Sequence, residues 1–231
     1  MFDQLTVLET AALVQAAYGY DYENNGGASD PAPLGDIGVK RAITIEGMEA
    51  LILANDLLIL VGTNQVWDWF DYNFDLFPNA GQRKRSIPEL AGASGAKYHG
   101  GFYEYAKLAY LLGAGTQIKA ITGHSLGGAA AQILGASWRL PTITFGSPQP
   151  LASRNHPIEL TPNIVNFCRK DDMVCKMPPL RRYRHIGQTF WMDRDGFDFS
   201  FDHPMPEYVD IIAEARVGLV PRLPDGWQIG T

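Results

Sequence analysis

The fold class of this chain is indicated by one stretch, residues 118–128, which reads IKAITGHSLGG. Its first four residues form a short, mostly apolar run typical of a buried strand, and a helical apolar pattern follows and extends to Arg139. Between them lies the pattern Gly-x-Ser-x-Gly, in which Gly123 and Gly127 allow close backbone approach at a sharp turn. The stretch therefore predicts a strand–turn–helix unit that lifts the Ser125 hydroxyl above a sheet.

A serine in such a turn is a candidate nucleophile. The helix that begins there would offer N–H groups and positive dipole to a developing oxyanion. Because a serine hydroxyl is a weak nucleophile, it would need a histidine base and an acid that orients the base. The alternative is a serine that only caps a helix, with the glycines serving packing, but the position between strand and helix favours the nucleophile.

The base must come from five histidines. His124 lies inside the turn, where its side chain is directed away from Ser125, and we expect it to be structural. Hydrolases with this turn place the acid and then the histidine after the serine, which leaves His185 and His203.

The acid candidates lie after the serine as well. Asp171 and Asp172 directly follow the apolar run Ile164–Phe167, and α/β folds place function at the carboxyl ends of strands. The rival acids lie in one stretch shortly before His203: Asp193, Asp195, Asp198 and Asp202.

Hydrophobic periodicity outlines the remaining elements. Helices are expected over 6–18, 102–112, 126–139 and 206–215; strands over 39–45, 49–53, 57–61, 118–121, 142–145 and 164–167; a loose β segment over 181–192; and a long loop over 76–97. This order favours an α/β sheet with short crossovers.

Composition limits the classes of protein. With 231 residues, 46% of them hydrophobic, the chain fits a single domain over 1–231. A net charge of −6 speaks against nucleic-acid binding. No apolar run is long enough for a transmembrane segment, and the first residues make a poor secretory signal. We expect a cytoplasmic protein; the alternative is a secreted one whose leader is absent from this chain.

Only two cysteines are present, Cys168 and Cys175. No histidine or cysteine lies at zinc spacing around them, so we expect no metal. Free thiols are the simpler interpretation, and a local disulfide is the alternative.

Several segments together resemble the class 3, fungal-type lipases of the α/β-hydrolase fold. The matching segments are Val61-Gly62-Thr63 with Asp68-Trp69 and Asp71, His99–Phe102, Ile121–Ala129, Thr144–Pro148, Asn166–Val174 with Pro178, and His203 with Tyr208. The resemblance implies a mostly parallel central sheet flanked by helices. It also implies a serine carboxylic-ester hydrolase that cleaves acylglycerols or similar acyl esters through an acyl-enzyme and needs no cofactor.

The resemblance implies roles for particular residues. Ser125 would be the nucleophile, Asp172 the acid and His203 the base, while His185 would be structural. The oxyanion hole would be formed by the N–H groups of Leu126 and Thr63.

Two departures from the family pattern matter. The family usually has Arg before Gly-Thr, and here the residue is Val61, so support of the oxyanion loop must differ. The family's Asp-x-Val-Pro ends here in Cys175, which leaves Asp171 as a rival acid.

Residues 64–75, NQVWDWFDYNFD, follow the oxyanion residue directly, where the family places its lid. On a helix, Trp67, Phe70 and Phe74 would share one apolar face. We expect these residues and Trp69 to contact substrate as a lid that opens at a lipid–water interface; the alternative is a fixed wall of an acyl pocket.

Other functions share this pattern. A phospholipase A1, a feruloyl-type esterase or a polyester-cleaving esterase would use the same three residues. The alternative from another class is a non-catalytic hydrolase-fold protein that binds lipid or a partner. The sequence predicts neither the acyl chain length of the substrate nor an oligomeric state.

Overall fold

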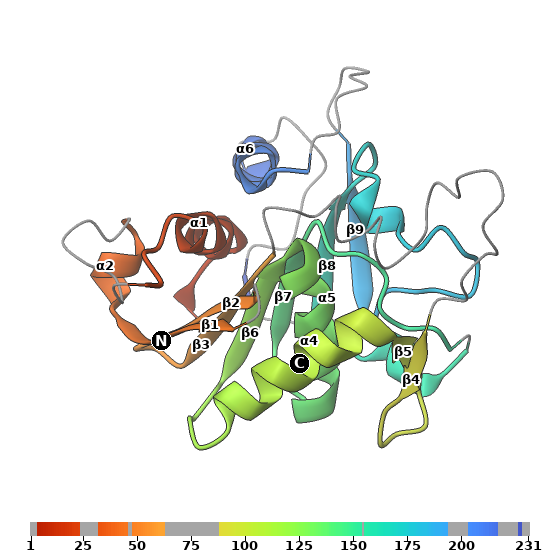
Figure 1. Ribbon diagram of the computed structural model, residues 1–231. Coiled ribbons are helices and arrows are strands. Elements are labelled where there is room, and N and C mark those ends of the chain that lie inside the picture. Colours follow the sequence, from red (N-terminus) through yellow and green to blue (C-terminus); the bar gives the residue numbers. More distant parts are fainter. Residues whose placement is uncertain are drawn as a thin grey trace, which may run out of the picture.

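The computed structural model describes residues 4–23, 32–45, 48–62, 88–153, 155–193, 203–216 and 226–227. A seven-stranded sheet runs through the centre in the order β1-β2-β3-β6-β7-β8-β9 (Figure 1). Its strands are β1 (Val39–Ile45), β2 (Met48–Leu53), β3 (Leu57–Val61), β6 (Ala120–His124), β7 (Thr142–Phe145), β8 (Ile164–Arg169) and β9 (Gln188–Met192). A separate hairpin is formed by β4 (Glu89–Ala91) and β5 (Lys97–His99).

The strand directions place the site. β1, β2 and β3 pair antiparallel, whereas β3, β6, β7, β8 and β9 are all parallel to one another. The carboxyl ends of parallel strands meet at one edge of a sheet. The residues after β6, β7 and β8 therefore gather there.

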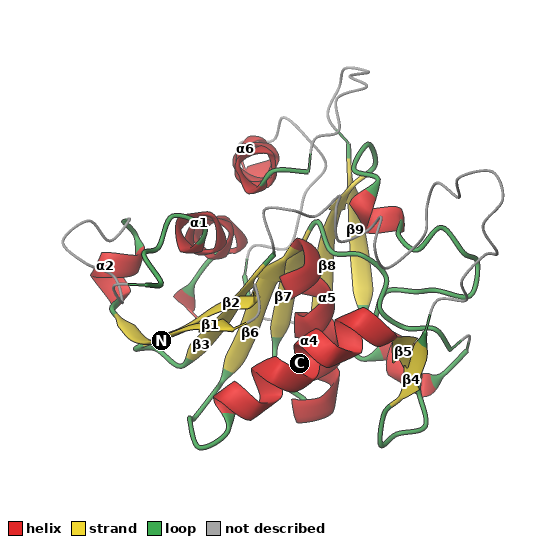
Figure 2. Ribbon diagram, in the orientation of Figure 1, coloured by secondary structure: helices red, strands yellow, loops and turns green. Residues whose placement is uncertain are grey.

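Helices cover both faces of the sheet (Figures 1 and 2). The described helices are α1 (Val7–Ala17), α2 (Leu34–Ile37), α4 (Gly100–Gly113), α5 (Ser125–Trp138) and α6 (Met205–Arg216), with 3₁₀ turns η2 (Pro157–Leu160) and η3 (Val174–Lys176). One apolar core lies under α4 and α5, and a second lies under α1 and α6. The result is a three-layer sandwich, in agreement with the predicted α/β class.

Local sequence explains the element boundaries. At the start of α1, the Thr6 hydroxyl accepts from the Glu9 amide at 3.1 Å, and the Glu9 carboxylate accepts from the Thr6 amide at 2.7 Å, which is a capping box. All five residues of β3 are buried, as expected for a central strand that helices cover on both faces.

Two expectations about secondary structure were wrong. The β segment 181–192 is a strand only from Gln188 on, because the chain turns at Tyr183, whose amide donates to the Leu180 carbonyl, and again at Gly187, where φ is +82°. Within the expected loop 76–97, residues from Glu89 on form the β4–β5 hairpin. The two strands pair antiparallel, with Glu89 opposite His99. Each strand has only three residues, which is too short for a periodic pattern to be recognised in the sequence.

The contact between α5 and β3 predicts the effect of one substitution. A Cβ added to Gly127 would lie 2.2 Å from the Leu60 carbonyl oxygen, so Gly127→Ala must force α5 away from β3. We expect it to lower the free energy of unfolding by about 3 kcal/mol or more in urea titrations. Gly35→Ala, where a Cβ would meet nothing within 4 Å, is the control and should stay near wild type. Equal effects of the two substitutions would contradict the packing argument.

Candidate active site

Ser125 occupies a strained turn at the carboxyl edge of the sheet. It directly follows β6 and has φ of +57°, a left-handed conformation that non-glycine residues rarely adopt. Its neighbour across the turn, Gly62, has no room for a side chain, because a Cβ there would lie 2.7 Å from the Ser125 Cβ. The end of β3 thus packs directly against the serine.

The Ser125 hydroxyl oxygen and the Nε2 atom of His203 are both buried. Neither atom has a hydrogen-bond partner among the described residues. A buried polar atom without a partner is costly, and such atoms gather at functional sites. Both atoms are therefore free to engage a ligand or each other.

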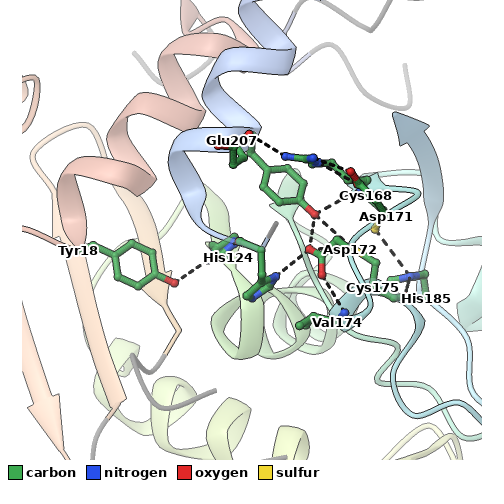
Figure 3. Close-up of polar contacts among 12 residues, drawn as sticks. Tyr18, His124, Cys168, Asp171, Asp172, Val174, Cys175, His185 and Glu207 are labelled. Carbon is green, nitrogen blue, oxygen red and sulfur yellow. Dashed lines mark hydrogen bonds and ion pairs between the residues drawn. The ribbon is translucent and has the colours of Figure 1, made fainter. Parts of the chain in front are cut away.

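Asp172 and His203 form a short hydrogen bond. The Asp172 carboxylate follows β8 and is 1% exposed, and its Oδ2 lies 2.7 Å from His203 Nδ1. The same oxygen accepts from the Tyr208 hydroxyl at 2.6 Å, while Oδ1 accepts from the Val174 amide at 2.8 Å. Figure 3 shows Asp172 at the centre of these contacts.

These donors keep the carboxylate charged. Burial would raise the pKa of Asp172, but the charge of His203 and the hydrogen bonds from His203, Tyr208 and Val174 outweigh it and hold that pKa below its ordinary value. An ionised, immobile carboxylate is suited to orient a histidine and to stabilise its protonated form.

Asp171 lies in a different network. Its carboxylate forms a two-pronged ion pair with Arg169, at 3.0 Å and 2.6 Å, and Arg169 also binds Glu207 of α6 at 3.1 Å. The structure therefore brings Asp172, and not the rival Asp171, to His203. His185, the other late histidine, lies beside Cys168 and Gln132.

His124 connects the serine turn to His203. Its Nε2 lies 2.9 Å from the His203 backbone carbonyl, and the two rings stack with centroids 4.6 Å apart. Because a carbonyl only accepts, Nε2 carries the proton, so Nδ1 accepts from the Tyr18 hydroxyl at 2.6 Å. Tyr18 in turn accepts from the Gly62 amide at 3.2 Å. Sequence reasoning expected a structural His124 but missed Tyr18, which no motif marks.

Tyr105 supports Val61, the residue at the position where the family usually has Arg. The Tyr105 hydroxyl of α4 donates to the Val61 carbonyl at 2.5 Å and accepts from the Glu49 amide. Glu49 and Val61 are partners in the β2–β3 ladder, so this hydroxyl is inserted at the end of that ladder. Together with Tyr18, it holds the Val61–Gly62 peptide from both sides.

Some predicted site residues cannot be placed. Thr63 and the expected lid, residues 64–75 with Trp67, Trp69, Phe70 and Phe74, lie outside the described residues. Leu126 is described and buried in the first turn of α5, where backbone N–H groups have no partner within the helix. Among the described residues, no cluster of three or more His, Cys, Asp or Glu side chains could hold a metal ion. None of the helices described is long and apolar enough to cross a membrane.

A mostly parallel sheet with a strained serine turn at its carboxyl edge defines the class of α/β-hydrolases. The sequence profile of the family described as "Lipase (class 3)" matches residues 57–182, more than half of the chain. The chain therefore belongs to the class 3 lipase family and is a hydrolase of the lipase and esterase type, as its sequence segments predicted.

Solved structures agree in fold. A lipase from Rhizopus microsporus var. chinensis matches with a TM-score of 0.57 and 22% identity, covering 82% of this chain and 75% of its own. Nonglycosylated Lip2 lipase from Yarrowia lipolytica matches with a TM-score of 0.55 and 16% identity, covering 82% of this chain and 79% of its own. Lipase II from Rhizopus niveus matches with a TM-score of 0.54 and 21% identity, covering 79% of this chain and 78% of its own. A search of curated proteins by sequence finds no match.

The burial of His124 predicts a pH dependence of stability. Burial, with a smaller contribution from the charge of His203, lowers the pKa of His124 to about 3. An unfolded histidine titrates near pH ~6.5, so the unfolded chain binds more protons between these values, and stability falls as pH drops through that window. The slope from this residue is up to about 1.4 kcal/mol per pH unit.

The variant His124→Asn tests this, because an asparagine keeps an acceptor for Tyr18 but cannot titrate. In urea unfolding between pH ~6.5 and pH ~4.5, we expect a flatter pH dependence than in the wild type. An unchanged slope would show that His124 is not the group that titrates.

Proposed function

We propose that this chain is a serine carboxylic-ester hydrolase that forms an acyl-enzyme on Ser125, with His203 as base and Asp172 as acid. The observation that carries the proposal is the 2.7 Å bond between Asp172 Oδ2 and His203 Nδ1, with the His203 ring stacked on His124, the residue that precedes the strained Ser125. Membership of the class 3 lipases supports the same chemistry.

The reaction follows from these positions. Asp172 holds Nδ1 of the His203 ring. The other ring nitrogen, Nε2, takes the Ser125 proton as the serine oxygen attacks the ester carbonyl. The protonated histidine then passes that proton to the leaving alcohol, and the acyl group stays on Ser125. Water, activated by His203, attacks the acyl-enzyme and releases the acid.

Developing negative charge needs preorganised donors. The Leu126 N–H, in the first turn of α5, would be one donor, and the Thr63 N–H would be the other. Such donors are worth about 3 kcal/mol each at the barrier. Tyr18 and Tyr105 support this role, since they anchor the residues that lead directly into Thr63. In this chain the two tyrosines replace the family's arginine as supports of the oxyanion loop.

The substrate class follows from the sequence next to this loop. Residues 64–75 carry five of the 26 Phe, Trp and Tyr residues, which suits an apolar acyl chain. We propose acylglycerols or similar acyl esters as substrates, with this segment as a lid that opens where lipid can take up its apolar surface.

Loss of the nucleophile tests the reaction type. Ser125→Ala should lower turnover of a p-nitrophenyl ester at least about 1000-fold, because no acyl-enzyme can form. Ser137→Ala is the matched control on the same helix, because Ser137 is an exposed residue whose hydroxyl donates to the Ile133 carbonyl. Retained turnover in the Ser125 variant would refute the assignment, while an inactive wild type that still binds lipid would favour a non-catalytic protein.

The two neighbouring aspartates give a second test. Asp172→Asn should lower kcat by about 1000-fold or more, because His203 loses the carboxylate that holds and stabilises it. Asp171→Asn breaks only the ion pair with Arg169 and should leave kcat within about threefold. Steady-state kinetics on the same ester separate the cases, and a reversed order would identify Asp171 as the acid.

Emulsified substrate tests the lid. A lipase with a lid should show a jump in rate when an acylglycerol exceeds its solubility limit, because the interface stabilises the open state. Rates measured across that limit, over a series of acyl chain lengths, decide the point. A flat response would contradict the lid and favour an esterase with a fixed wall.

A further inference from the structure

The two cysteines of the chain lie on either side of the acid loop. Cys168 is the penultimate residue of β8, Cys175 belongs to η3, and Asp172 lies between them. Both sulfurs are free thiols and fully buried, and the two side chains interact with one another. The proposed reaction uses neither of them, nor does it use His185 beside them (Figure 3).

Cys168 lies beside a hydrogen-bond donor. His185 Nε2 lies 3.0 Å from the Cys175 carbonyl, which only accepts, so this nitrogen carries a proton. The same atom lies 3.9 Å from Cys168 Sγ, and Gln132 donates to the other ring nitrogen at 3.5 Å. Cys168 therefore accepts an N–H from His185.

This arrangement favours a thiolate on Cys168. Burial raises the pKa of Cys168, but its interactions with Cys175 and with His185 outweigh burial and lower that pKa. A thiolate is the reactive form of cysteine toward peroxides.

Cys175 has the opposite environment. Its Sγ lies 3.6 Å from Asp172 Oδ2 and 3.3 Å from the Tyr208 hydroxyl, and burial next to these groups raises its pKa. Cys175 therefore stays a thiol, and its proton is available to the same carboxylate oxygen that binds His203. The two cysteines are thus unequal: one is suited to attack and the other to resolve.

We propose that Cys168 and Cys175 form a redox-active pair that closes to a reversible disulfide when a hydroperoxide oxidises Cys168. Closure removes the Cys175 S–H from Asp172 and so slows ester hydrolysis, a consequence that rests on the proposed function.

The chemistry balances with one hydroperoxide. The Cys168 thiolate attacks a peroxide oxygen, the O–O bond breaks, and after protonation the products are a Cys168 sulfenic acid and one water. The Cys175 sulfur then attacks the Cys168 sulfur, the S–O bond breaks, and the hydroxyl leaves as a second water with the Cys175 proton. In total, two thiols are oxidised and one hydrogen peroxide is reduced to two waters.

A small oxidant can approach from the loop that carries Cys175. Met173 is 45% exposed, and Lys176 is exposed as well. The buried Cys175 sulfur therefore belongs to a short segment that reaches the surface on both sides of it. Local opening of such a segment needs far less free energy than global unfolding.

The experiment treats the full chain with hydrogen peroxide and then alkylates it under denaturing conditions. We expect both thiols to be lost, and a tryptic digest should contain residues 155–169 joined to residues 171–176. Turnover of a p-nitrophenyl ester should fall about fivefold and return after dithiothreitol, since one hydrogen bond to the acid is lost and restored. Oxidation of Met173 would not reverse with dithiothreitol, so reversibility separates the two lesions.

Two variants assign the order of events. In Cys175→Ser, which keeps a hydroxyl donor near Asp172, peroxide should leave a dimedone-reactive sulfenic acid on Cys168 and cause no reversible loss of turnover. In Cys168→Ser, Cys175 should react little with dimedone. Preferential labelling of Cys175 would reverse the assignment.

Failure of each proposal has its own signature. The proposed redox-active pair is refuted if both thiols survive peroxide, or if they form disulfides with another chain instead of with each other. A disulfide that forms without any change in turnover overturns its coupling to Asp172. Thiol counts and peptide masses do not depend on ester hydrolysis, so an inactive wild-type chain would refute the proposed function without touching the disulfide.

Discussion

The close contact between α5 and β3 is the constraint on which the rest of the site depends. Gly127 lies against the Leu60 carbonyl with no room for a side chain, so the helix starts as near to the sheet as a backbone can. The turn that connects β6 to this helix is sharp, and in it Ser125 takes a left-handed conformation. The contact brings the end of β3 beside the serine, which is where the proposed oxyanion loop begins. The proposed nucleophile and the proposed oxyanion loop thus lie on either side of one backbone contact.

Around this turn, strain is offset by hydrogen bonds from elements distant in sequence. Tyr18 from α1 and Tyr105 from α4 hold the Gly62 amide and the Val61 carbonyl, and His124 connects Tyr18 to the backbone of His203. Each of these polar groups has a hydrogen-bond partner, which favours a rigid network. A site that must stabilise a transition state benefits from donors that do not need to reorganise.

Several features were predictable because they depend on local sequence. The strand before Ser125, the helix after it and the α/β class follow from apolar periodicity and two glycines, and the family assignment followed from the order of short segments. The prediction was wrong where periodicity was weak. Residues 181–187 alternate like a strand, yet turns at Tyr183 and Gly187 end the pattern. The β4–β5 hairpin was missed because strands of three residues carry too little periodic signal.

The sequence by itself determined that this chain builds a mostly parallel sheet with a serine turn at its edge, since apolar periodicity and the glycines on either side of Ser125 are local signals. Only the tertiary structure decided which of two adjacent aspartates contacts His203, which hydroxyls support the end of β3, and that the Cys175 thiol contacts Asp172. These contacts join residues from different strands and helices. Their partners are chosen by distances and directions that arise only when the layers pack, and no local pattern encodes them.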